Sequence, residues 1–165
     1  MPRWLPILLV AVLLLAPVIT QALASQDLRR FEITPDNGVV MSRDAAASVA
    51  ATCSRPFPSG LTGYWVPLPS DLARLETTLA GYLDERIPFE QRPRTPTVPI
   101  LRQYVGMYRS GRKVIYVNGF NGDPVPQLPW RTELLRVCDG GPTNFGLVFD
   151  TATGAFTDFL SNPWF

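Results

Sequence analysis

The first 24 residues decide which part of this 165-residue chain folds, and in which compartment. A single positive charge at Arg3 precedes an almost wholly apolar run over residues 5–16, and an Ala-Leu-Ala site at 22–24 stands before Ser25. A charged start, an apolar stretch of about 12 residues and a small-x-small exit are typical of a cleaved secretory signal. We therefore expect residues 1–24 to be a signal peptide and the mature chain to begin at Ser25.

A retained membrane anchor is the alternative interpretation of the same residues. A spanning helix needs about 20 apolar residues, and residues 4–24 reach that length only by including Pro17, Thr20 and Gln21. The pattern favours export to the periplasm or cell envelope, with the anchor as the minor alternative. We expect residues 25–41 to be an N-terminal lead-in segment and residues 42–165 to form a single domain.

The charge balance bears on the class of partner. The chain has 15 basic and 14 acidic residues, and removal of Arg3 with the signal leaves 14 of each. A neutral chain has no broad basic surface for phosphate backbones, so we expect no nucleic-acid partner. It also lacks the basic juxtamembrane run that anionic lipids attract, so we expect no membrane partner after signal cleavage.

The absence of histidine excludes several reaction classes. The whole chain contains no histidine, and Lys113 is its only lysine. Ser-His-Asp and Cys-His catalysis need an imidazole to accept a proton, and the usual catalytic zinc sites need imidazole ligands. Carboxylate or lysine chemistry is what remains for an enzyme. The sequence assigns no catalytic residue, no metal site and no cofactor.

Two cysteines, Cys53 and Cys138, lie in the part of the chain bound for an oxidising compartment. An even number of cysteines there favours a disulfide, and two buried free thiols are the alternative. The cysteines are 85 positions apart (138 − 53), so a bridge would stabilise the fold by roughly 4–5 kcal/mol in the loop-entropy description. We expect the pair to be bridged.

The order of sequence patterns predicts an α+β fold. Ser42 is typical of a helix N-cap before an alanine-rich helix to about Cys53, and Ser70 before a second helix with apolar residues at helical spacing. Asp71, Arg74 and Glu76 are expected away from the apolar face of that second helix. Two proline-rich stretches, residues 55–69 and 88–99, are expected to be a loop and a stiff connector, with polyproline II as the alternative for the connector.

Strand patterns follow the second proline-rich stretch. Residues 100–109 and 112–120 flank Ser110-Gly111, a two-residue hairpin loop. Further strands are expected over residues 133–138, 145–149 and 155–160. Together the patterns predict two N-terminal helices packed on one face of an antiparallel sheet of about four to five strands.

A set of short strings gives the chain a resemblance. It resembles a family of small uncharacterised exported proteins of Gram-negative bacteria, and the similarity covers about residues 41–162. The resemblance implies a periplasmic or envelope setting, supports the cysteine pairing and implies no activity. The strings that carry it occur in this order: Cys53-Ser54-Arg55, Trp65-Val66-Pro67, Leu75-Glu76 with Leu79 and Tyr82-Leu83, Arg102-Gln103-Tyr104-Val105-Gly106, Ile115-Tyr116-Val117-Asn118 and Val137-Cys138-Asp139-Gly140-Gly141.

The predicted hairpin carries the first candidate binding surface. Aromatic residues beside an arginine are typical of binding surfaces. The alternative is that the tyrosines cover the core beneath the helices, each hydroxyl reaching water or a backbone group. The candidate residues are Arg102, Tyr104, Tyr108, Tyr116 and Asn118.

Asp139 is the remaining candidate. The glycines at 140 and 141 would let a ligand or metal approach the backbone, with Asp123 and Glu133 as possible partners. The alternative interpretation of Asp-Gly-Gly-Pro is a tight turn after a strand, because glycine tolerates positive φ.

These features favour a non-enzymatic binding or structural module of the envelope. Its partner would be a protein, a peptide or a cell-wall ligand that the sequence does not identify. A carboxylate-dependent hydrolase of cell-wall glycans is one alternative, with Asp139 and Glu133 as acid and base. An inhibitor of another enzyme is the other alternative.

The export hypothesis makes a direct prediction about the native product. Its intact mass should correspond to a chain that begins at Ser25, and alkylation under non-reducing, unfolding conditions should modify neither cysteine. A product that retains Met1, or two alkylated thiols, would contradict the hypothesis.

Overall fold

The computed structural model describes residues 35–51, 53, 55–92, 99–122 and 128–164. The predicted signal peptide, residues 25–34 of the lead-in segment and Asp123 lie outside these ranges. Among the described residues, no helix combines the length and apolar character that a bilayer crossing requires.

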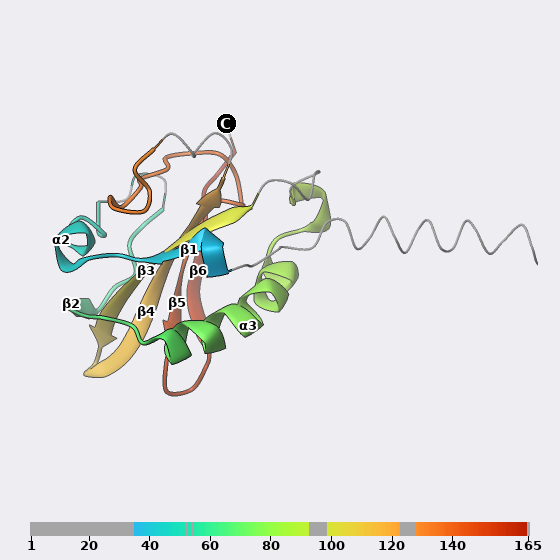
Figure 1. Cartoon of the computed structure of the whole chain (residues 1–165). Helices are drawn as coiled ribbons and strands as arrows, with labels where there is room; N and C mark the ends of the chain where they lie inside the picture. The colour runs from blue at the N-terminus through green and yellow to red at the C-terminus, as the bar shows by residue number, and fades with distance from the viewer. Residues whose placement is uncertain (1–34, 52, 54, 93–98, 123–127, 165) are drawn as a thin grey trace, which may run out of the picture.

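A long hairpin forms the centre of the structure (Figure 1). Strand β3, Ile100–Arg109, pairs antiparallel with β4, Arg112–Asn121, along its whole length. The loop residues Ser110 and Gly111 have φ angles of 50° and 78°. Positive φ at both positions is typical of the type I′ turn, whose twist matches that of the flanking strands. The sequence prediction of this hairpin is confirmed.

Four further strands complete one mixed sheet. β5 (Phe145–Asp150) pairs with β4, and β6 (Phe156–Ser161) pairs with β5, both antiparallel. The free side of β3 is shared: β1 (Gly38–Val40) pairs parallel with one half of β3, and β2 (Leu61–Trp65) pairs antiparallel with the other. The strand order in the sheet is β1-β3-β4-β5-β6, and β2 also pairs with β3.

The predicted fold class is wrong in both its helices and its strands. The described residues contain six strands in a mixed sheet and one long helix, α3 (Pro69–Arg86), instead of two helices on four to five antiparallel strands. The first predicted helix is the single turn α2, Arg43–Ala46, although Ser42 does accept a hydrogen bond from the Ala45 N–H as its cap. An alanine-rich run with only Ala46 and Val49 buried has little apolar surface to sustain a longer helix.

Two other segments differ from the sequence prediction. The expected loop over residues 55–69 contains β2, because its prolines stand before residue 59 and after residue 66 and leave the strand itself free of proline. The expected strand over residues 133–138 is irregular. Its backbone bonds to side chains of the sheet rather than to another strand, as described below.

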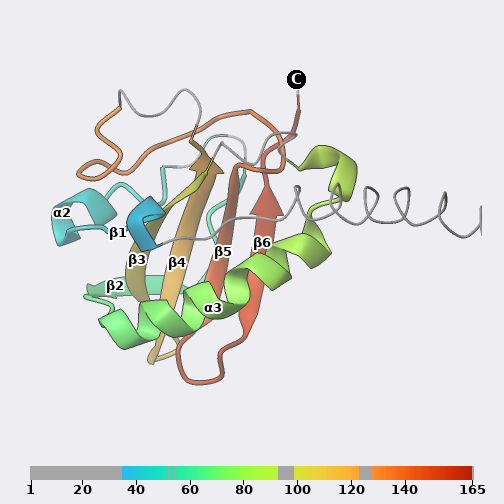
Figure 2. The ribbon, with the colours of Figure 1, turned by 45° about the vertical axis from the view of Figure 1, so that its right-hand side comes forward.

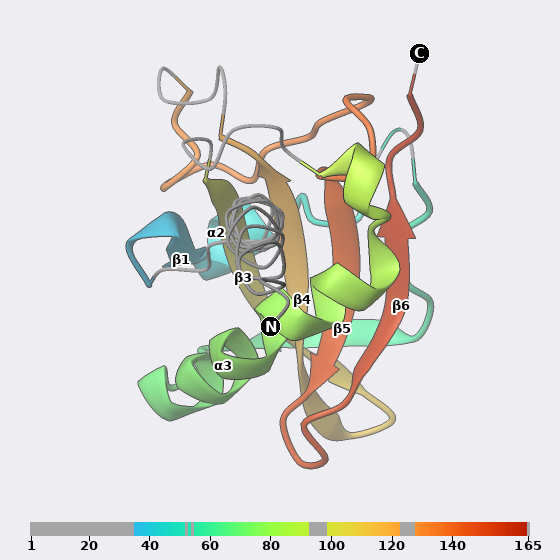
Figure 3. The ribbon, with the colours of Figure 1, turned by 90° about the vertical axis from the view of Figure 1, so that its right-hand side faces the viewer.

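The sheet is covered differently on its two faces. Helix α3 crosses one face diagonally (Figure 2), and Leu75, Leu79 and Leu83 of the helix are fully buried against the sheet. Figure 3 views the sheet face-on, with α3 in front of it and α2 behind. On the α2 side the sheet is covered by Met41, Ala46 and Val49 and by an irregular segment around Trp130. The two faces of the sheet are therefore covered by different layers, one formed by the long helix α3 and the other by the single turn α2 and irregular segments.

Two glycines provide a test of this packing, because replacing each by alanine should change the stability of the protein in opposite directions. Gly81 of α3 is exposed, and an added Cβ would meet nothing within 4 Å. Gly81→Ala should therefore stabilise the protein by about 0.5–1 kcal/mol through helix propensity. A Cβ on Gly106 would lie 2.1 Å from the Trp65 carbonyl oxygen, so Gly106→Ala should force β2 away from β3 and cost about 1–3 kcal/mol. Urea unfolding measures both, and equal effects of the two changes would contradict the described β2–β3 contact.

Candidate functional site

The five hairpin residues predicted to form one surface lie on two different faces of the sheet. Tyr104 pairs with Val117, and Asn118 pairs with Gln103. Because side chains alternate along a strand, Tyr104 and Asn118 project to opposite sides. Arg102, Tyr104 and Tyr108 face α3, whereas Tyr116 and Asn118 face the irregular layer. Tyr108 is partly exposed and the other four are buried.

On the helical side, Arg102 and Tyr104 form a buried cluster with Glu76 of α3. Arg102 is fully buried, and its guanidinium lies 2.7 Å from Glu76 Oε1. The Tyr104 hydroxyl donates to the same oxygen at 2.6 Å and accepts from Arg102 Nε at 2.8 Å. Glu76 thus faces the sheet, contrary to the expectation from sequence. Each charge is satisfied within the protein, so the cluster is suited to joining helix and sheet rather than to holding a ligand.

On the opposite side, an open cleft of about 310 Å³ lies over β4. Its floor is formed by Arg55, Tyr116 and Asn118. One wall, here called the N-terminal wall, consists of Ser48, Val49, Ala51 and Cys53. The other, the loop wall, consists of Leu134, Leu135, Arg136 and Val137. Of the predicted surface, Tyr116 and Asn118 line this cleft, whereas Tyr104 lines a separate pocket together with Glu76.

A chain of buried polar side chains runs beneath the loop wall. Asn118 Nδ2 donates to Gln103 Oε1 and to the Leu135 carbonyl oxygen, both at 2.9 Å. Gln103 in turn donates to the carbonyl oxygens of Trp130 and Glu133 and accepts from the Leu135 N–H. These bonds satisfy backbone N–H and C=O groups of the irregular segment that have no partner on a neighbouring strand. The irregular layer is therefore held to the sheet by amide side chains.

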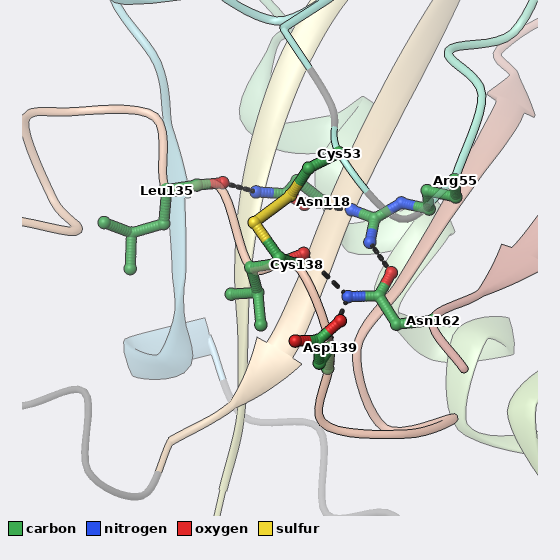
Figure 4. Close-up of a disulfide and its surroundings, with 8 residues drawn as sticks. Cys53, Arg55, Asn118, Leu135, Cys138, Asp139 and Asn162 are labelled. Carbon is green, nitrogen blue, oxygen red and sulfur yellow. Dashed lines mark hydrogen bonds between the residues drawn. A yellow bond between two sulfur atoms is a disulfide. The ribbon is translucent and has the colours of Figure 1, made fainter. Parts of the chain in front are cut away.

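Arg55 lies at the end of this chain, between two asparagines (Figure 4). Its two terminal nitrogens donate to Asn118 Oδ1 and Asn162 Oδ1, each at 2.5 Å. Asn162 Nδ2 donates to the carbonyl oxygens of Val137 and Asp139 at 2.7 and 3.0 Å. Both asparagines therefore hold the guanidinium with their oxygens and the loop with their amide N–H groups.

Within the part of the chain that the structure describes, no counter-charge faces Arg55. Arg55 is 8% exposed, its Nε–H is buried without an acceptor, and no carboxylate of the described residues forms an ion pair with it. Amide oxygens are neutral and compensate only part of the cost of removing a cation from water. The cleft floor is therefore electropositive, and the exposed Arg136 on the loop wall adds to this charge.

A disulfide joins the two walls of the cleft. Cys53 of the N-terminal wall is bonded to Cys138, which follows the loop wall, with their Cα atoms 5.1 Å apart. The predicted pairing is confirmed. The bridge links two irregular segments, not a helix to a strand as the sequence analysis implies. In Figure 4 it lies beside the Asn118 and Arg55 side chains, so it fixes the segments that define the cleft.

Asp139 and Glu133 do not line the cleft. Both side chains are exposed on the irregular segment. Gly140 and Gly141 have φ angles of 89° and 72°, the left-handed conformation of the tight-turn interpretation, and the ring of Trp164 packs against Gly141. Among the described residues, no cluster of three or more Asp, Glu or Cys side chains is placed to hold a metal ion.

Sequence reasoning missed three residues of the network: Arg55, Gln103 and Asn162. Gln103 could have been identified from the sequence, because a buried amide in the middle of an apolar strand needs polar partners above the sheet. No sequence pattern identifies Arg55 and Asn162, since they are far apart in the chain and meet only through the tertiary fold.

The Tyr104 cluster predicts how stability depends on alkaline pH. Burial raises the pKa of the Tyr104 phenol well above its usual value of 10.0, and the opposing effect of Arg102 is smaller. The unfolded chain therefore loses this proton before the folded protein does, so stability is complete below pH 10 and declines as the pH rises further. Unfolding at a series of pH values should show a loss to which Tyr104 contributes up to about 1.4 kcal/mol per pH unit. Tyr104→Phe should reduce this slope and leave the part due to Tyr82, whose pKa burial also raises. An unchanged slope would contradict the assignment.

Comparisons of the chain with protein-family models, with curated proteins and with solved structures find no match. The resemblance to exported envelope proteins therefore stays a prediction, and the candidate site rests on the geometry of the cleft.

Proposed function

We propose that this chain is an exported protein of the cell envelope that acts by binding a ligand in the Arg55 cleft, without catalysing a reaction. The observation that carries the proposal is the cleft itself: about 310 Å³ of open space over a floor of buried, ordered polar side chains. Ligand sites combine apolar walls with a few fixed polar groups in this way.

The disulfide supports the exported setting. Cys53 and Cys138 are bonded to each other, and disulfides persist mainly in oxidising compartments. The charged start, apolar run and Ala-Leu-Ala site of residues 1–24 point in the same direction.

The composition of the cleft favours binding over catalysis. Its described lining residues include no carboxylate, and its one cysteine is held in the disulfide. The chain has no histidine to act as a general base. The hydrolase alternative relies on Glu133 and Asp139, which both lie outside the cleft.

Two neighbouring alanines provide a matched test. Ala51 lines the cleft, whereas the adjacent Ala50 is also exposed but does not line it. The purified native protein is incubated with the peptide and small-molecule fraction of a bacterial envelope extract, and bound ligands are detected by native mass spectrometry. We expect a retained ligand with the wild type and with Ala50→Trp, and its loss with Ala51→Trp, because the indole fills the cleft.

Thermal unfolding of both variants serves as the control for folding. Absence of any retained ligand, or equal retention by Ala51→Trp at unchanged stability, would overturn the proposal.

A further inference from the structure

We infer that the Arg55 cleft binds a ligand through a carboxylate group, carried by the C-terminus of a peptide or by a small organic acid. The inference rests on the proposed function and specifies the chemistry of the ligand. It is carried by the position, charge and hydrogen bonding of one guanidinium.

The first step is the uncompensated charge. Arg55 is more than nine-tenths buried and lines the cleft, and within the described ranges its only acceptors are two neutral amide oxygens. A buried cation without a counter-charge is costly, and an anion bound beside it would lower that cost. Solvent and ligand reach this region through the cleft, so an anionic group that enters it would supply the missing charge.

The second step is the orientation of the donors. Each terminal nitrogen of a guanidinium has two N–H groups, and Asn118 and Asn162 each occupy one. Among the described residues, only Asn118 and Asn162 accept from the terminal nitrogens, which leaves one N–H on each for a ligand, while the Nε–H is buried beside Gly146 without an acceptor. Because the asparagines fix the plane of the guanidinium before a ligand arrives, little side-chain entropy is lost on binding. A planar fork of this kind matches the two oxygens of a carboxylate.

The third step distinguishes a carboxylate from a phosphate. Both walls are largely apolar, with Val49 and Ala51 on one side and Leu134, Leu135 and Val137 on the other. A carboxylate with an apolar substituent places its charge on Arg55 and its substituent between these walls. Inorganic phosphate has no apolar part to bury there, and one fixed guanidinium supplies few of the donors that its oxygens accept.

The position of Arg136 gives the cleft a second positive charge at its rim. It is exposed and lies on the loop wall. An exposed charge of this kind accelerates the approach of an anion and is screened by salt, whereas contact with a buried guanidinium is screened much less. Arg136→Gln should therefore weaken binding a few-fold at low salt and leave it nearly unchanged at high salt.

The test compares ligands that differ in a single charge. Isothermal titration calorimetry is performed on the native protein with N-acetyl-Ala-Ala-Leu carrying a free carboxylate, with the same peptide as its C-terminal amide, with hexanoate and with inorganic phosphate. We expect the free peptide acid, the hexanoate or both to bind, and the amide and phosphate to bind at least about ten-fold more weakly, since charge-assisted hydrogen bonds are stronger than neutral ones. The tighter of the two acids identifies the source of the carboxylate.

Arg55→Lys keeps the charge and removes the fork, and it should weaken acid binding while leaving the amide unaffected. Because Arg55 also supports the fold, a second measurement avoids variants at this position. The Arg55 Nε–H resonance of the wild type should shift on titration with the acid and not with the amide, and the Ala51→Trp protein should show no shift where Ala50→Trp does.

The outcomes separate this inference from the proposed function. Equal binding of acid and amide, preferential binding of phosphate, or binding of neither acid would overturn the carboxylate assignment. If an envelope ligand is still lost selectively with Ala51→Trp in that case, the proposed function stands with a different ligand. If no ligand depends on Ala51, both proposals fail.

Discussion

One side of this molecule depends on hydrogen bonds between buried amide side chains and the irregular residues 130–139. The amides belong to the sheet and to the C-terminal segment. A segment without a strand partner must satisfy its backbone groups in another way, or remain exposed to water. Gln103, Asn118 and Asn162 provide the partners. Since all three are almost fully buried, loss of one would leave both a backbone carbonyl and a side-chain amide unsatisfied, which makes the network highly cooperative.

The two faces of the sheet are therefore stabilised by different physics. On the α3 face, three leucines of one helix stripe pack into an apolar layer, and the Arg102–Glu76 pair is fully satisfied. On the other face, a short turn and two irregular segments are linked by a disulfide and a polar network. Helices pack against a sheet to high density, whereas irregular segments do not align their side chains in ridges. It is on this second face, between the two irregular segments, that the Arg55 cleft lies.

Local signals in the sequence identify part of this structure. The Ser110-Gly111 loop locates the central hairpin, and leucine spacing locates α3, because both depend on neighbouring residues. The two-residue loop also fixes the register, so that partners on β3 and β4 have residue numbers of opposite parity. Tyr104 and Tyr116 therefore cannot share a face, and the predicted stripe overlooked this consequence. The strand β1 and the position of Arg55 depend on contacts distant in sequence, which no local pattern encodes.

The choice of asparagine beside Arg55 follows from two demands on the same side chain. Positions 118 and 162 must each accept a hydrogen bond from the guanidinium and donate to a carbonyl oxygen of the loop. An aspartate would meet the first demand and neutralise Arg55, but an ionised carboxylate has no N–H to donate and would repel the loop carbonyls. An amide meets both demands and leaves the positive charge in place. The same bonds that hold the irregular layer on the sheet thus preserve a cation at the floor of the cleft, and this coupling is why a structural network and an anion site occupy one place in the fold.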